Sequence, residues 1–65
     1  MNNKIFTYQY LENIHYIILK LNFAIENGTS LRLWLAENTP TANFTSVVIE
    51  FTTKEDVALF LLRWS

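Results

Sequence analysis

The chain has one glycine, Gly28, and one proline, Pro40, in 65 residues. A globular chain of this length usually carries about eight residues of these two kinds. Collagen-like structure and disordered sequence rich in proline and glycine are therefore excluded. A glycine-rich loop that holds phosphate groups is excluded as well, because such loops need several glycines close together.

The chain is expected to form one small domain, residues 1–65, in which 51% hydrophobic residues supply the core. A domain of this size buries only about 60% of the surface that its unfolded chain exposes. The sequence has no cysteine, so disulfides cannot add stability. The core must therefore suffice alone or be completed by a partner, and the many large apolar side chains favour the partner.

Five Lys and Arg against six Asp and Glu give a net charge of −1. This balance creates no long-range field toward nucleic acid or anionic lipid. The N-terminal residues show no secretory signal pattern. The longest candidate membrane stretch, residues 14–25, contains His15, Lys20 and Asn22 and is shorter than the ~20 apolar residues of a spanning helix. We expect a cytoplasmic protein without a membrane anchor.

Residues 14–26 allow two interpretations. Helical spacing relates Leu11, Ile14, Ile18, Leu21 and Ile25, and strand-like alternation relates Ile17, Leu19, Leu21, Phe23 and Ile25. The abundance of Ile, Tyr and Phe and the final Asn27-Gly28 pair favour a strand that ends in a hairpin turn.

The following run, residues 30–36, also alternates, with Leu31, Leu33 and Leu35 on one face. We predict a hairpin whose three-residue loop, residues 26–28, sets Phe23 opposite Leu31. Gly28 would then have a positive φ.

A further strand is predicted at each end of this hairpin. Residues 4–10 form a β-prone run that turns back at residues 11–13, which sets Tyr8 opposite Tyr16 and Phe6 opposite Ile18. Residues 37–43 are a loop by composition. Residues 44–51 alternate again and form the last strand.

The final element is a helix. Thr52 or Thr53 can cap its start, with Glu55 and Asp56 in its first turn. Its apolar stripe consists of Val57, Phe60, Leu61 and Trp64. Together the elements predict an α+β fold, an antiparallel meander sheet of three or four strands with one C-terminal helix on the leucine-rich face.

In this arrangement aromatic and basic side chains share the sheet face opposite the leucines. The predicted interface residues are Phe6, Tyr8, Tyr10, Tyr16, Ile18 and Trp34, joined by Leu59 and Leu62 of the helix; Lys4, Lys20 and Arg32 project beside them. Aromatic residues and arginine are enriched in protein interfaces, and one short helix covers only one face of a sheet. We therefore expect a non-catalytic interaction protein that self-associates as a homodimer or higher homo-oligomer, or docks on another protein.

Two alternatives remain open. The same face could stack the bases of single-stranded nucleic acid on Tyr8, Tyr16 and Trp34, with Lys20 and Arg32 at the phosphates. Three cations offset by one carboxylate give little counterion release, so this function ranks second. In the other alternative the helix covers the aromatic face.

The sequence contains few residues that could support catalysis or bind a metal ion. His15 is the single histidine, and Glu12 is the only carboxylate near it in the sequence. A metal site or a nucleophilic triad needs several such groups. We expect no enzyme activity, no cofactor and no metal.

The C-terminal sequence Val48-Ile49-Glu50-Phe51, followed by residues 56–64, resembles the ending of small uncharacterised proteins of tailed phages, including marine phages. In those proteins a strand leads into an acidic cap and a helix that ends in Arg-Trp. The resemblance covers about the last third of the chain, and here Leu61-Leu62 replaces a polar residue often seen after Phe. It implies a phage origin, the host cytoplasm as the setting, and a host-interaction or virion-associated role, without an assigned activity.

Overall fold

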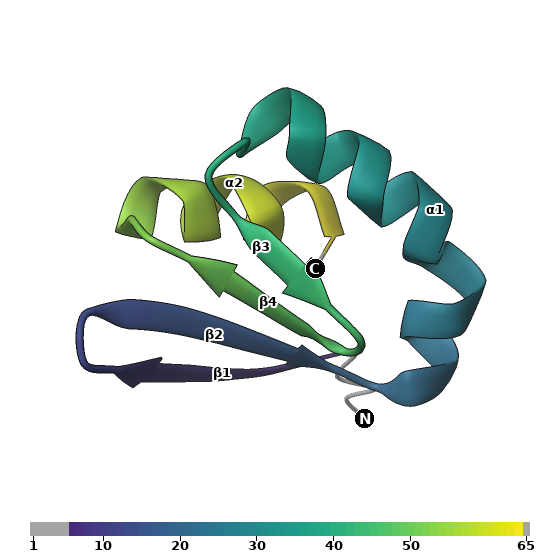
Figure 1. The fold of residues 1–65 in the computed structure, drawn as a ribbon, viewed down its shortest axis with the longest axis horizontal. Coiled ribbons are helices and arrows are strands. Elements are labelled where there is room, and N and C mark those ends of the chain that lie inside the picture. Colours follow the sequence, from purple (N-terminus) through teal and green to yellow (C-terminus); the bar gives the residue numbers. More distant parts are fainter. Residues whose placement is uncertain (1–5, 65) are drawn as a thin grey trace.

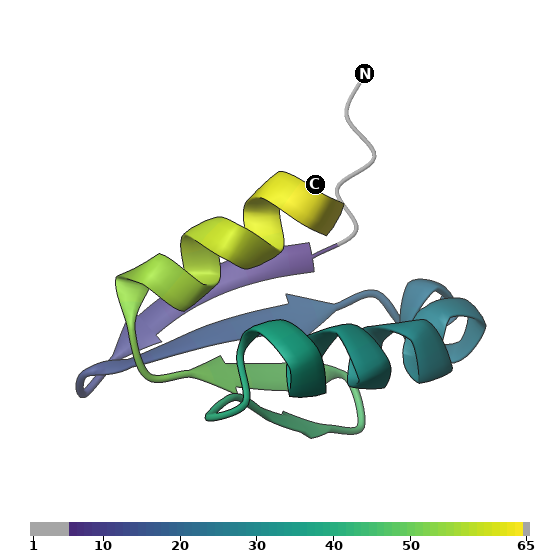
Figure 2. The same ribbon diagram turned by 90° about the horizontal axis from the view of Figure 1, so that it is seen from above.

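The computed structural model describes residues 6–64, which form β1 (Phe6–Leu11), β2 (Ile14–Leu19), α1 (Leu21–Asn38), β3 (Asn43–Thr45), β4 (Val48–Phe51) and α2 (Lys54–Trp64). The strands make one antiparallel sheet in the order β1-β2-β4-β3, and both helices lie over the same face of it (Figures 1 and 2). The predicted α+β class, with a four-stranded antiparallel sheet and a C-terminal helix, is confirmed. The central pairing of β2 with β4 departs from a simple meander, and α1 is a second helix that the sequence analysis did not predict.

The chain builds the same pattern twice, two strands followed by a helix. β2 and β4 pair in the middle of the sheet with Ile17 opposite Ile49. Each helix then packs against the edge strand of the other unit (Figure 2). The Phe60 ring of α2 lies 5.7 Å from the Phe6 ring of β1, and Arg32 of α1 bonds to the backbone of β3. Neither unit therefore completes its core alone.

A two-residue turn joins β1 to β2. Glu12 and Asn13 have φ values of 51° and 69°, as in the type I′ turn whose twist matches that of the flanking strands. Leu11 and Ile14 lie opposite each other on either side of it. The predicted three-residue turn at residues 11–13 is therefore wrong.

The shorter turn changes the register of this hairpin by one residue. Tyr8 lies opposite Ile17, and not opposite Tyr16 as predicted; Phe6 likewise lies opposite Leu19, and not Ile18. A shift of one residue exchanges the two faces of a strand relative to its neighbour. Phe6, Tyr8 and Tyr10 consequently project on the side that carries the helices.

α1 occupies the segment where a hairpin was predicted, so the strand over residues 30–36, the strand beyond residue 19 and the loop at 26–28 are wrong. Ala24, Leu31 and Leu35 are buried at helical spacing. Leu33, which alternation placed beside these leucines, is 62% exposed. Residues four apart share a face in a strand and in a helix alike, which is why Leu31 and Leu35 fitted both interpretations.

The Asn27-Gly28 pair lies inside α1 and makes no turn. The side-chain amide of Asn27 donates to the Phe23 carbonyl at 3.1 Å, four residues earlier. Gly28 has no positive φ, contrary to prediction. The helix ends two residues before Pro40, and the Thr39 backbone amide donates to the Leu35 carbonyl at 2.8 Å.

The single strand predicted for residues 44–51 is a hairpin of two short strands. Ser46, with a φ of 56°, and Val47 form the turn between them. The Leu19 amide donates to the Val47 carbonyl at 2.7 Å, so contact between β2 and this hairpin continues past the end of β4.

α2 begins as predicted. The Asp56 amide donates to the Thr53 hydroxyl at 3.1 Å, so Thr53 is the cap. The Thr52 hydroxyl instead lies 3.3 Å from that of Thr41.

The core lies between the sheet and the two helices. Phe60 is fully buried at its centre, with ring centroids 5.7 Å from Phe51 and 6.3 Å from Trp34. The buried apolar residues are Ile17, Leu19, Ala24, Leu31, Leu35, Ile49, Phe51, Val57 and Phe60. Within residues 6–64, neither helix combines the length and the apolar character needed to cross a bilayer.

Candidate functional site

Within residues 6–64, β1 is the most exposed of the longer strands of the sheet. β1 lies at the end of the strand order, and its residues 7–11 are all exposed. Its sequence, FTYQYL, contains no charge and no proline. Natural proteins usually protect a free edge with charged residues, proline, a bulge or a covering element, because an unprotected edge pairs with other chains. We call this free edge, with the side chains of Tyr8 and Tyr10, the β1 edge.

The turn geometry identifies which backbone groups of the β1 edge are free. The two residues that flank a two-residue turn exchange hydrogen bonds, so the N–H and C=O groups of Leu11 point toward β2. Along a strand, the backbone N–H and C=O groups of successive residues point alternately to the two sides. The outward N–H and C=O groups therefore belong to Tyr10, Tyr8 and Phe6.

The two tyrosine side chains are exposed but held in place. Tyr8 is 47% and Tyr10 55% exposed. The Tyr8 hydroxyl is hydrogen-bonded to buried His15 Nδ1 at 2.7 Å, and the Tyr10 ring lies on the His15 ring with centroids 4.6 Å apart. The Tyr10 hydroxyl donates to Asn13 Oδ1 at 3.1 Å. Rings fixed in this way lose little conformational entropy when a partner binds.

Exposed apolar side chains concentrate near this edge. Of the nine large hydrophobic residues that are exposed within residues 6–64, six belong to β1 or α2, and α2 lies beside β1 (Figure 2). These six are Tyr8, Tyr10, Leu11, Leu59, Leu61 and Leu62. The other three are Leu21, Ile25 and Leu33 of α1.

The opposite edge of the sheet is short and partly covered. β3 has three residues, and Arg32 Nη1 of α1 donates to the Phe44 carbonyl at 3.3 Å. Shortness and capping by a side chain both discourage edge pairing. Among residues 6–64 the two edges therefore differ, and the β1 edge is the one left open.

The structure disperses the predicted interface residues over several surfaces. Phe6 packs on Phe60 at the rim of the core. Tyr16 and Ile18 lie half-buried on the sheet face without helices. Trp34 is half-buried between the helices, 6.4 Å from the Trp64 ring. Tyr8, Tyr10, Leu59 and Leu62 remain exposed, as the interface hypothesis requires, while Lys4 lies outside the described residues.

The residues of the nucleic-acid alternative do not form one platform. Tyr8 and Tyr16 project from opposite faces of the sheet, and Trp34 packs inside. Arg32 lies at β3, and Lys20 lies between β2 and α1. A stacking platform needs rings and cations on one surface, and the arrangement of these residues does not provide one.

Two exposed side chains were not expected from the sequence. Leu11 is 58% exposed at the end of β1, and Leu61 is also exposed, although the helical stripe placed Leu61 in the core. Within residues 6–64, no three His, Asp or Glu residues lie together as a metal site would require.

Comparisons with protein-family models, curated proteins and solved structures found no match for this chain. The phage resemblance therefore stays a prediction.

Proposed function

We propose that this protein is a non-catalytic interaction protein that self-associates by pairing the β1 edges of two copies. The observation that carries the proposal is the unprotected edge of β1, six residues long and without charge or proline. The capped, three-residue β3 edge supports it by contrast, because the same molecule protects one edge and leaves the other free. The cysteine-free chain is compatible with a reducing compartment, and we place this assembly in the cytoplasm.

Two copies would pair antiparallel about a two-fold axis perpendicular to the sheet. Such an interface is isologous, and a two-fold dimer is the commonest closed assembly. The two sheets would then form one continuous sheet with all helices on one side. Paired residues must share a face, so Tyr8 would lie opposite Tyr8 or Tyr10 of the second copy. Aromatic cross-strand pairs of this kind contribute about 0.2–1 kcal/mol each.

The expected affinity is modest. Pairing of one strand buries less surface than a standard interface, and association itself costs roughly 4–15 kcal/mol. Outward backbone groups and fixed tyrosine rings offset this cost. We expect a reversible dimer with a dissociation constant of about 1–100 μM.

Sedimentation over a concentration series tests this proposal with a matched pair of variants. Gln9→Lys introduces a charge into the β1 edge on the exposed helix-free face, where like charges of two copies would meet. Thr45→Lys introduces the same charge on the same face of β3. We expect wild type and Thr45→Lys to dimerise at micromolar concentration and Gln9→Lys to stay monomeric, with unchanged circular dichroism.

Two other outcomes would contradict the proposal, one for self-association itself and one for the position of the interface. A wild-type monomer over the whole series removes self-association. A dimer that survives Gln9→Lys but is lost in Ile18→Lys moves the interface to the helix-free sheet face.

A further inference from the structure

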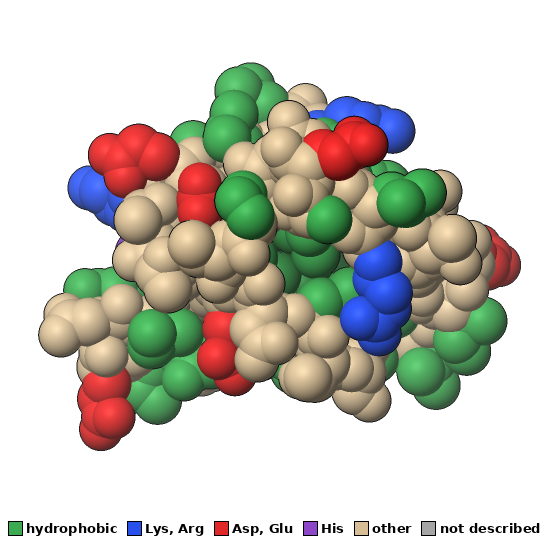
Figure 3. All heavy atoms as spheres, turned by 45° about the horizontal axis from the view of Figure 1, so that its top comes forward, with side chains coloured by type: hydrophobic (Ala, Val, Ile, Leu, Met, Phe, Trp, Pro, Cys, Tyr) green, Lys and Arg blue, Asp and Glu red, His purple; other side chains and the backbone are tan. Residues whose placement is uncertain are grey.

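A groove separates the C-terminal half of α1 from β3, on the side of the molecule away from the β1 edge. Its volume is about 280 Å³, and its lining residues lie between positions 32 and 44. Figure 3 shows the hollow near the centre of the view, with apolar atoms at its floor and a basic side chain at its rim. Small-molecule sites are typically concave, mostly apolar and equipped with a few polar groups that orient the ligand.

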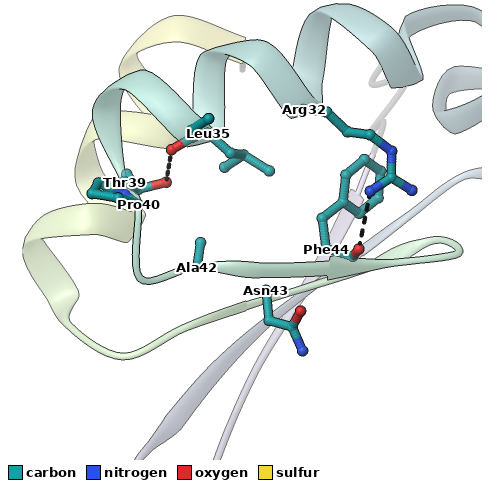
Figure 4. A pocket seen from close by; sticks show the side chains of 8 residues that line it. Arg32, Leu35, Thr39, Pro40, Ala42, Asn43 and Phe44 are labelled. Carbon is teal, nitrogen blue, oxygen red and sulfur yellow. Dashed lines mark hydrogen bonds between the residues drawn. The ribbon is translucent and has the colours of Figure 1, made fainter.

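Arg32 is the charged residue of this groove, and two contacts orient its exposed side chain. Its guanidinium carbon lies 4.5 Å from the centre of the Phe44 ring, and Nη1 donates to the Phe44 carbonyl at 3.3 Å (Figure 4). A guanidinium has five N–H donors, and this contact uses one of them. The ring and the carbonyl thus hold the fork in one orientation, which reduces the entropy lost when it binds an anion.

The remaining walls carry no charge. Leu35, Ala36, Pro40 and Ala42 are apolar. Thr39 is fully buried, and its hydroxyl is already committed to the Leu35 carbonyl at 3.4 Å (Figure 4). Polar atoms make up slightly more of the exposed lining than apolar atoms do, so a single cation at one end complements a single negative charge on a small molecule that carries no other charge.

Charge and size select the ligand class. Arginine binds a carboxylate through two parallel hydrogen bonds, whereas a dianionic phosphate ester usually meets more than one cation. At about 280 Å³ the groove lies just below the usual range of pockets for drug-sized ligands, so it suits a smaller molecule. We propose that this groove binds a small monocarboxylic acid, and that Arg32 is its anchor.

Titration of ¹⁵N-labelled protein with phenylacetate, followed by NMR, tests this inference. We expect shifts at residues 32–44, with a dissociation constant of about 1–10 mM for so small a ligand. Phenylacetamide has the same shape without the charge, and we expect it to bind at least tenfold more weakly. Dimer formation at the β1 edge does not enter this test, so either proposal can fail without the other.

Arg63 provides the matched control, because it also stacks on an aromatic ring, 4.3 Å from the centre of Trp64. We expect Arg32→Gln to weaken phenylacetate binding at least tenfold and Arg63→Gln to leave it unchanged. Ala36→Leu, which fills part of the groove from an exposed helix position, should weaken both probes.

Three results would overturn the inference. The first is no shift at residues 32–44 up to 20-fold above the expected dissociation constant. The second is equal loss in the two arginine variants, which indicates non-specific attraction of anions. The third is binding of a short peptide ending in a phenylalanine carboxylate at least tenfold more tightly than phenylacetate, which assigns the groove to a chain end.

Discussion

At four residues of this chain the backbone conformation is unfavourable for the amino acid that adopts it. Glu12, Asn13 and Ser46 have positive φ values, although left-handed backbone is unfavourable for residues with a side chain. Gly28, the residue best suited to such a conformation, lies inside a helix. Glycine there lowers stability because it loses the most conformational freedom on folding. Both kinds of position are open to stabilising substitution.

Gly28→Ala is expected to raise the free energy of unfolding by about 0.4–1 kcal/mol. The added methyl group would meet no heavy atom within 4 Å, and alanine restricts the unfolded chain. Urea denaturation measures the change. A loss of stability would contradict the helix and favour a left-handed Gly28.

Thr53→Ala is expected to lower the free energy of unfolding by about 1 kcal/mol, because the Asp56 amide loses its capping hydroxyl. Thr52→Ala is the control, since the Thr52 hydroxyl contacts only an exposed Thr41. We expect less than half the effect there. Equal losses in urea denaturation would contradict the assignment of Thr53 as the cap.

The turn of the β1–β2 hairpin determines on which face of the sheet the side chains of the β1 edge lie. Its two-residue turn places Tyr8 and Tyr10 on the helix side, against His15. A three-residue turn would reverse the faces. The turn thus determines which side chains accompany the free edge.

Glu12→Asn is expected to stabilise this hairpin by about 0.5–1 kcal/mol, because asparagine tolerates a left-handed φ better than glutamate does. Thermal denaturation measures the change. Glu26→Asn, at an exposed position inside α1, is the control and should be destabilising. A lower melting temperature for Glu12→Asn would contradict the type I′ turn.

The whole molecule depends on one contact centre that joins its two units. Phe60 of α2 meets rings from β1 and α1 of the first unit and from β4 of its own unit, so removing it weakens both the contact between the units and the packing of α2 on its own strand. The two-unit pattern makes the sheet continuous from β1 to β3, with the open β1 edge and the Arg32 groove at its two ends. The proposed self-association and the proposed ligand binding therefore use separate surfaces.

Phe60→Ala is expected to cost about 3–5 kcal/mol, most of the stability of so small a domain. Circular dichroism at 25 °C should show a largely unfolded chain. Leu62→Ala, at a residue that is 84% exposed, should change stability by less than about 0.5 kcal/mol. A cooperative Phe60→Ala fold with wild-type stability would contradict the position of this residue in the core.

The sequence by itself determined the α+β class, the strand character of residues 6–19 and the C-terminal helix with its threonine cap. These features rest on local signals, namely composition, capping residues and short-range periodicity, which act wherever the segment lies. The exposure of Tyr8, Tyr10, Leu59 and Leu62 was also predicted, although the two tyrosines were expected on the sheet face opposite the helix and project on the helix side.

Only the tertiary structure decided the conformation of residues 21–38 and the register of β1. Leu31 and Leu35 satisfy strand and helix periodicity equally, and local propensities differ by too little to choose between them. The helix prevails because it buries these two leucines against the sheet while Leu33 faces outward. The register likewise follows from burial, because pairing Phe6 with Leu19 brings the Phe6 ring against Phe60.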